Sequence, residues 1–164
     1  MIKQIKLVGF IAITALILSA CSTTEQKEVL DMDKVRLEIQ ALEDAYAIIE
    51  NANYALAFSS GVAATDAVIK LLQPGDEVIC GNDMYGGTYR LFTKIFEKFG
   101  IKFHSVNMQD ASAIESFINE NTKLVWTETP TNPLMNICDI AALAQITKKH
   151  NVLLCVDNTF ATPY

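Results

Sequence analysis

The stretch from Lys123 to Glu128 (KLVWTE), followed at once by Thr129 to Pro133 (TPTNP), decides the fold class. It is a short apolar run that passes into a polar loop, and the two prolines make that loop rigid. A continuous apolar run bounded by turn residues is typical of a strand that is covered on both faces of a sheet.

Short apolar runs of the same kind alternate with segments of helical periodicity along the rest of the chain. We predict strands at Tyr54–Phe58, Glu77–Cys80, Ile101–Val106, Lys123–Glu128 and Val152–Val156. Helices are expected at Asp31–Ile49, Val62–Leu72, Thr88–Phe99, Ser112–Asn119 and Ile140–His150. Strands separated by helices predict an α/β fold with a mostly parallel sheet.

Composition and charge exclude several classes of protein. The 164 residues are 51% hydrophobic and 20% charged, which excludes a disordered chain. The formal net charge is −6, so nucleic-acid binding has no electrostatic basis. Three of the four cysteines, Cys80, Cys138 and Cys155, lie far apart without zinc-site spacing. They indicate core residues in a reducing compartment and predict no metal site.

The first 21 residues have the pattern of an export signal. Lys3 and Lys6 precede the uncharged stretch Leu7–Ala20, whose 14 residues are too few to span a membrane as a helix. The end of this stretch, Leu18–Cys21 (LSAC), resembles the lipobox of bacterial lipoproteins. That resemblance implies a signal peptide at residues 1–20 and a membrane anchor through lipid on Cys21; the alternative is a buried N-terminal helix.

The loops that follow the predicted strands carry the candidate binding residues. Ser59-Ser60-Gly61 lies before the helix that starts at Val62, where backbone N–H groups and the helix dipole favour a phosphate. An ordinary N-cap with a tight turn is the alternative. Tyr85 stands before two glycines, which suits either a ring leaning over a flat ligand or a turn packed on the domain.

Two more strand ends supply an amide and an acid, Asn132 and Asp157. An acid at the end of a buried strand needs a cation or a protonated heterocycle as its partner. A phosphate cradle, a flat aromatic ring, an amide and a buried acid together meet the needs of pyridoxal phosphate (PLP).

Five ordered stretches between residues 51 and 164 resemble one enzyme family. They are Ala57–Gly61, Leu72–Val78, Tyr85–Arg90, Glu128–Pro133 and Val156–Phe160. The family is that of the Cys/Met metabolism PLP-dependent enzymes, the cystathionine γ-synthase, cystathionine γ-lyase and methionine γ-lyase group. The resemblance implies part of a fold-type-I large domain, C–S bond cleavage or γ-replacement on sulfur amino acids, a homo-oligomer and a cytoplasmic location, which conflicts with the export signal.

The resemblance also implies roles for individual residues. Ser60, Gly61 and Val62 would bind the cofactor phosphate, and Tyr85 would stack on the pyridine ring as a candidate acid or base.

Further along the chain, Asn132 would contact the cofactor oxygen or the substrate carboxylate. Asp157 would pair with the ring nitrogen, with Thr159 and Glu128 in support.

The sequence departs from the family in two places. The 164 residues contain no Ser-x-Thr-Lys motif, which in the family supplies the Schiff-base lysine, and Lys148 and Lys149 match no part of it. We therefore expect an incomplete PLP site and no catalysis by this chain alone. The segment Met32–Ala47 resembles the first helix of small nuclear-transport-factor-like lipoproteins.

These departures predict a junction near Ala47. Residues 21–47 would be a tether and helix of lipoprotein origin, and residues 48–164 the enzyme part. The alternative function is a membrane-anchored, non-catalytic lipoprotein or a chimeric remnant.

Overall fold

The computed structural model describes residues 4–7 and 31–162. The strands are β1 (Gln4–Leu7), β2 (Glu77–Gly81), β3 (Lys102–Val106), β4 (Thr122–Glu128) and β5 (Leu153–Asp157). The α-helices are α1 (Met32–Ile49), α2 (Gly61–Ile69), α3 (Gly86–Lys94) and α4 (Ile140–Lys149). Two 3₁₀ helices, η3 (Phe96–Phe99) and η4 (Ala111–Phe117), complete the described elements.

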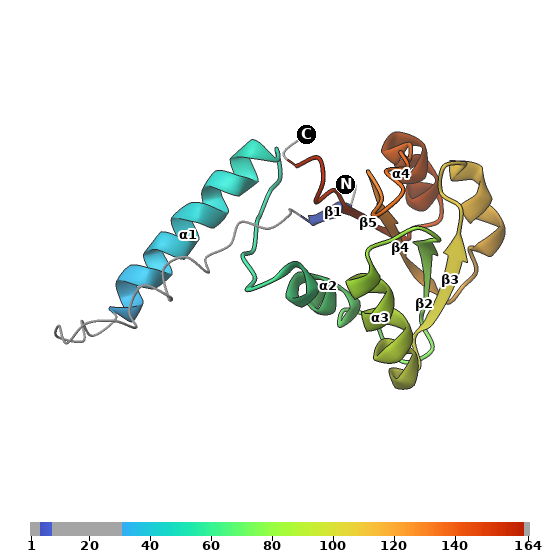
Figure 1. Ribbon diagram of the computed structural model, residues 1–164, viewed down its shortest axis with the longest axis horizontal. Helices are drawn as coiled ribbons and strands as arrows, with labels where there is room; N and C mark the ends of the chain where they lie inside the picture. The colour runs from blue at the N-terminus through green and yellow to red at the C-terminus, as the bar shows by residue number, and fades with distance from the viewer. Residues whose placement is uncertain (1–3, 8–30, 163–164) are drawn as a thin grey trace.

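The five strands form one parallel sheet in the order β1-β5-β4-β2-β3 (Figure 1). The predicted α/β class and parallel sheet are therefore confirmed. Strands β2 to β5 lie within a residue or so of their predicted positions. The central strands β2, β4 and β5 carry the short, largely apolar run that a doubly covered strand requires, whereas β3 lies at the edge of the sheet and buries only Val106. The carboxyl ends of all these strands meet at one edge of the sheet, where the candidate residues Tyr85, Asn132, Asp157 and Thr159 are found.

Helices cover both faces of the sheet (Figure 1). Val78 and Cys80 point to the face packed by α2 and α3, and Ile79 between them points to the face packed by α4 and η4. On the first face Phe92 stacks on Phe103 at a centroid distance of 4.5 Å and meets Trp126 edge-on at 5.5 Å. These two apolar layers fix the sheet, and with it the loops at its carboxyl edge.

The predicted strand Tyr54–Phe58 is wrong. The segment is an irregular connection between α1 and α2, and Tyr54 and Leu56 are 89% and 74% exposed. Its continuous apolar residues match a strand pattern, but in the described structure no neighbouring strand lies beside it to accept its backbone hydrogen bonds. One backbone N–H, that of Ala57, instead donates to Glu43 Oε1 on α1 at 2.7 Å.

Two predicted helices are shorter or tighter than expected. The helix expected at Thr88–Phe99 ends at Lys94 and continues as η3, whose tighter turn places Phe96 in the core. The segment expected at Ser112–Asn119 is the 3₁₀ helix η4, which buries only Ile114. One buried anchor gives too little packing to extend a longer α-helix.

The N-terminal residues add an edge strand to the sheet. Gln4–Leu7, which the sequence assigns to a signal peptide, pairs in parallel with Leu154–Asp157 of β5. The proposed lipidation site, Cys21, lies outside the described residues. Within the described ranges, no helix has the length and hydropathy to cross a membrane.

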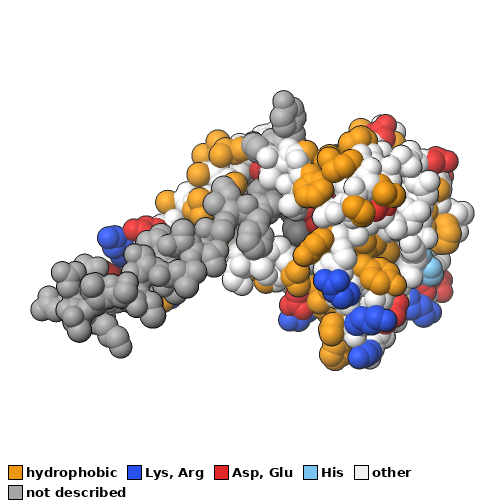
Figure 2. Space-filling model, in the orientation of Figure 1, with side chains coloured by type: hydrophobic (Ala, Val, Ile, Leu, Met, Phe, Trp, Pro, Cys, Tyr) orange, Lys and Arg blue, Asp and Glu red, His pale blue; other side chains and the backbone are white. Residues whose placement is uncertain are grey.

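Helix α1 stands apart from the sheet and its covering helices (Figure 1). It begins after Asp31, whose side chain accepts from the N–H groups of Asp33 and Lys34. None of its residues is buried, and Figure 2 shows hydrophobic side chains lying open along it. Leu37 and Ile48 are 71% and 80% exposed.

Candidate functional site

The amino end of α2 presents free backbone donors. Ser60 is the N-cap, and its hydroxyl accepts from the N–H of Ala63 at 3.0 Å. Among the described residues, the N–H groups of Gly61 and Val62 have no acceptor. The amino end of α2 therefore carries two backbone N–H groups without acceptors, at a partly exposed position. The positive end of the helix dipole lies at the same place.

The loop after β2 carries Tyr85 as the N-cap residue of α3. The Tyr85 ring is 47% exposed and lies directly over Gly87, where a Cβ atom would overlap the ring. Its backbone N–H donates to Glu128 Oε2 at 2.8 Å. The hydrogen bond of the Tyr85 backbone thus fixes the position of the residue, and the lack of a side chain at Gly87 leaves room for its ring.

The loop after β4 begins at Glu128, a buried acid at the last position of the strand. Glu128 Oε1 accepts from the N–H of Asn132 at 2.7 Å, while Oε2 accepts from Tyr85. Burial raises the pKa of Glu128 to about 7; the two N–H groups oppose this rise, and the nearby carboxylates of Asp157 and Asp83 add to it.

Asp83 makes a second link between the same two loops. Its Oδ2 accepts from the Thr131 hydroxyl and, at 3.3 Å, from the side-chain amide of Asn136. Sequence reasoning missed Asp83. The available signal was its place just after Gly81, the last residue of β2, because an acid at such a place needs a partner.

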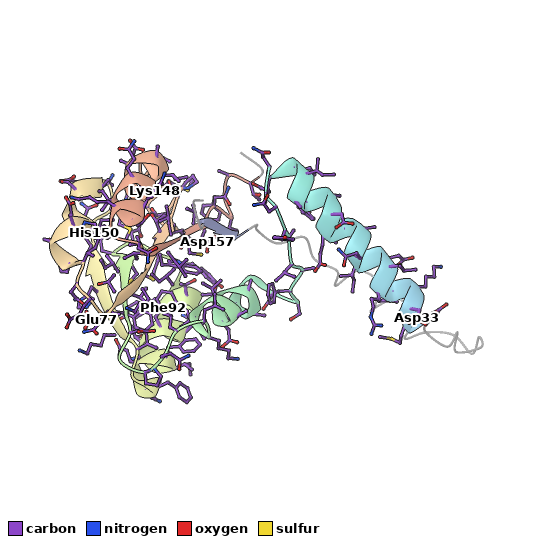
Figure 3. The ribbon with its side chains drawn as sticks, turned by 180° about the vertical axis from the view of Figure 1, so that it is seen from behind. Asp33, Glu77, Phe92, Lys148, His150 and Asp157 are labelled. Atoms are coloured by element: carbon purple, nitrogen blue, oxygen red, sulfur yellow. The ribbon has the colours of Figure 1, made fainter. Side chains whose placement is uncertain are left out.

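Asp157 ends β5, directly beside Glu128 in the register of the two strands. It is buried, and its Oδ1 accepts from the N–H of Thr159 at 3.2 Å and from the Thr159 hydroxyl at 2.6 Å. Its Oδ2 has no hydrogen-bond partner in the part of the chain that the structure describes. Figure 3 places Asp157 at the opposite end of the sheet from Glu77.

The structure brings together most of the predicted residues but not all. Tyr85, Asn132, Asp157 and Thr159 share the carboxyl edge of the neighbouring strands β2, β4 and β5. Ser60, Gly61 and Val62 lie on α2, which packs beside α3. No described hydrogen bond joins this end of α2 to the other group.

A small depression lies at the same edge of the sheet, beyond β2, β3 and β4. It includes Glu128 but none of the predicted cofactor residues. Its lining is Gly81, Asn82, Asp83, Asn107, Met108, Gln109, Thr127, Glu128, Thr131, Asn136 and Cys138.

The model of the family described as "Cys/Met metabolism PLP-dependent enzyme" matches residues 22–164. The chain belongs to this family. The match begins within residues 21–47, the predicted segment of lipoprotein origin, and runs through the predicted junction near Ala47. The resemblance inferred from the five stretches is confirmed, and PLP is the cofactor of the family.

Known members of the family are similar over most of this chain. The Bacillus subtilis (strain 168) cystathionine γ-synthase/O-acetylhomoserine (thiol)-lyase is 52% identical over 124 residues, which is 76% of this chain and 33% of that protein. Human cystathionine γ-lyase is 47% identical, over 75% of this chain and 31% of its own length. The chain thus spans about a third of the length of these relatives.

Solved structures of the family share the fold. The structure of metB from Corynebacterium glutamicum has a TM-score of 0.75 and 49% identity, covering 77% of this chain and 33% of that one. Cystathionine γ-lyase from Lactobacillus plantarum complexed with L-serine also has a TM-score of 0.75, at 39% identity, and covers 88% of this chain and 39% of that one. The fold is therefore that of the PLP-dependent enzymes of fold type I.

The described residues fit the chemistry of PLP. Two unused N–H groups at the start of α2 suit a phosphate, and the free Oδ2 of buried Asp157 suits a protonated ring nitrogen. The exposed face of Tyr85 and the Asn132 side chain, which has no described partner, are open to a flat ligand.

Proposed function

We propose that this chain carries the cofactor-binding front of a PLP-dependent trans-sulfuration site, which acts on sulfur amino acids by C–S cleavage or γ-replacement. The observation that carries the proposal is the buried Asp157, whose free oxygen lies at the strand edge that also bears Tyr85 and Asn132. Cystathionine synthase and lyase relatives at 45–52% identity support the reaction class.

Each residue has a defined task in this proposal. Bound PLP supplies an electron sink for charge that develops at the substrate carbon atoms. The N–H groups of Gly61 and Val62 hold the phosphate, and the carboxylate of Asp157 keeps a proton on the pyridine nitrogen. Tyr85 covers the ring and excludes water from that face, and the Asn132 amide orients the phenolic oxygen or the substrate carboxylate.

We further propose that the 164-residue chain binds PLP without a fixed covalent bond and does not catalyse the reaction alone. The support is the lack of a Ser-x-Thr-Lys motif in these 164 residues. Proton abstraction beside the substrate amine requires a positioned base, the role that the Schiff-base lysine has in the family.

Equilibrium dialysis of the purified chain against PLP, with and without borohydride, tests this proposal. We expect one bound PLP per chain and only scattered borohydride labelling of surface lysines. Asp157→Asn keeps every lysine, so it should weaken PLP binding at least about 10-fold, roughly 1.4 kcal/mol, and leave the scattered labelling unchanged. Equal binding by wild type and Asp157→Asn would refute the site.

The second candidate function is a lipid-anchored, non-catalytic lipoprotein, which the Leu18–Cys21 sequence favours. Metabolic labelling with a fatty acid in a bacterial host tests it. Wild type should incorporate label and sediment with membranes, and Cys21→Ser should do neither. If the two behave alike, the chain has no anchor at Cys21.

A further inference from the structure

Glu128 uses both of its oxygens on backbone donors from two separate loops. Oε2 accepts from the N–H of Tyr85, 43 residues away along the chain, at 2.8 Å. Oε1 accepts from the N–H of Asn132, four residues away, at 2.7 Å. The carboxyl group of Glu128 therefore links Tyr85, which covers the proposed site of the cofactor ring, to Asn132, which supplies the side-chain amide of that site.

The surroundings of Glu128 are acidic and apolar. Asp157 faces it from β5, Asp83 from the loop after β2 and Cys138 from the segment before α4. Among the described residues, no lysine, arginine or histidine pairs with Glu128. The two backbone N–H groups are therefore the groups that stabilise its charged form, and they depend on that charge in turn.

We propose that Glu128 is a positioning residue that fixes the distance between the Tyr85 loop and the Asn132 loop. This inference rests on the proposed function, which places both residues against PLP. A carboxylate accepts two hydrogen bonds at once, one on each oxygen. A glutamine of the same shape has one accepting oxygen, and its NH₂ group would face the second backbone N–H, so one of the two loops is released.

The link through Asp83 keeps the loops folded when Glu128 changes. Asp83 accepts from Thr131 and Asn136, and neither of these bonds involves Glu128. Loss of the Glu128 bonds therefore moves the Tyr85 and Asn132 segments relative to each other without separating β2 from β4.

Nuclear magnetic resonance of the ¹⁵N-labelled full chain tests the inference without any ligand. As pH rises from 5 to 9, the amide protons of Tyr85 and Asn132 should move downfield together, with one shared midpoint near the Glu128 pKa of about 7. This measurement needs only wild type, so it does not depend on a variant that folds. Two amides that do not titrate, or that titrate with separate midpoints, would overturn the inference.

Glu128→Gln should abolish the shared titration and shift both amide signals, with an unchanged far-ultraviolet circular dichroism spectrum. Glu77→Gln is the matched control. Glu77 is equally buried, at 5% exposure against 6% for Glu128, but it lies at the opposite end of the sheet and contacts Lys102, His104 and Asn119. It should leave the Tyr85 and Asn132 amides unchanged; if it removes their titration, Glu128 is not the cause.

A PLP titration separates this inference from the proposed function. We expect Glu128→Gln to weaken PLP binding about 10-fold and Glu77→Gln to leave it unchanged. If wild type shows the shared titration but binds no PLP, the link between the loops stands and the proposed function fails. If wild type binds PLP but Glu128→Gln binds it equally well, the proposed function stands and the positioning role is refuted.

Discussion

Gly87 is the residue where a single methyl group has the clearest predicted effect. A Cβ atom there would overlap the Tyr85 ring, so Gly87→Ala must push the ring away from α3. We expect the dissociation constant for PLP to rise about 10-fold, equivalent to roughly 1.4 kcal/mol. Dialysis against PLP measures the change, and circular dichroism should show an intact helix.

Gly86→Ala is the control for this substitution. Both glycines begin α3, and alanine favours a helix over glycine by up to about 1 kcal/mol. At position 86 the added methyl would meet only the end of the Arg90 side chain, at 3.4 Å. PLP binding should be unchanged, and a loss equal to that of Gly87→Ala would show that helix stiffening, not the Tyr85 ring, is responsible.

Glu128 gives the stability of the chain a definite dependence on pH. Its folded pKa of about 7 lies above the ordinary value of 4.5, so the folded state binds the proton more tightly than the unfolded state does. The free energy of unfolding should therefore fall as pH rises from about 4.5 to about 7, by up to about 3 kcal/mol. Urea unfolding across this range should show the fall in wild type and lose it in Glu128→Gln.

At the scale of an element, the start of β2 carries Glu77, a buried acid whose pKa is lowered where that of Glu128 is raised. Glu77 is buried and accepts from Asn119 at 2.8 Å, with His104 and Lys102 beside it. The hydrogen bond from Asn119, and then those with His104 and Lys102, lower its pKa to about 2. Its stabilising effect should be complete above pH 4.5 and be lost as pH falls from about 4.5 to 2.

Glu77→Gln tests this contribution. We expect the substitution to lower the free energy of unfolding at pH 7 by about 1–3 kcal/mol and to flatten the acid limb of the profile. Glu115→Gln is the surface control, since Glu115 is paired with Lys149 and His150 where solvent screens the charges. It should change stability much less, and equal losses would show that burial of Glu77 is irrelevant.

The sequence predicted elements well where local pattern and packing agree. The runs at Glu77–Cys80 and Lys123–Glu128 have continuous apolar centres, and both are central strands in which every side chain except that of Lys123 is buried. Tyr54–Phe58 carries an equally apolar pattern but is a linker, because a strand also needs a neighbour and no local signal reports one. The 3₁₀ character of Phe96–Phe99 likewise depends on the pocket that Phe96 enters.

For the candidate site, too, local pattern predicted the positions of residues along the strands but not the contacts between distant loops. The sequence predicted that Asn132, Asp157 and Tyr85 lie at one edge of the sheet, because each stands at or just after the end of a recognisable strand and the strand ends of a parallel sheet share one edge. The hydrogen bonds that link the loops to one another were not predicted. Glu128 reaches Tyr85 across 43 positions and Asp83 reaches Thr131 across 48, distances over which spacing in a sequence carries no information about contact.

For the whole molecule, α1 predicts self-association. Leu37 and Ile48 are largely exposed on a helix that buries none of its residues. Exposed apolar surface of this kind favours contact between copies. The double variant Leu37→Gln with Ile48→Gln should reduce association in sedimentation velocity while the melting temperature stays within a degree or two, because neither side chain supports the core.

Leu143→Ala supplies the comparison. Leu143 lies on α4 and is fully buried against the sheet, so its truncation should cost about 2–5 kcal/mol. It should lower the melting temperature and leave the contact through α1 intact in the folded fraction. If the α1 double variant destabilises the chain as much as Leu143→Ala does, Leu37 and Ile48 support the core and do not mediate association.

The pairing of β1 with β5 has a consequence for the order of events during synthesis. Gln4–Leu7 is made first, yet its partner Leu154–Asp157 is made about 150 residues later. In the described sheet β1 lies at one edge and pairs with β5 alone. Among the described strands, the first along the chain is therefore the last that can take its place in the sheet.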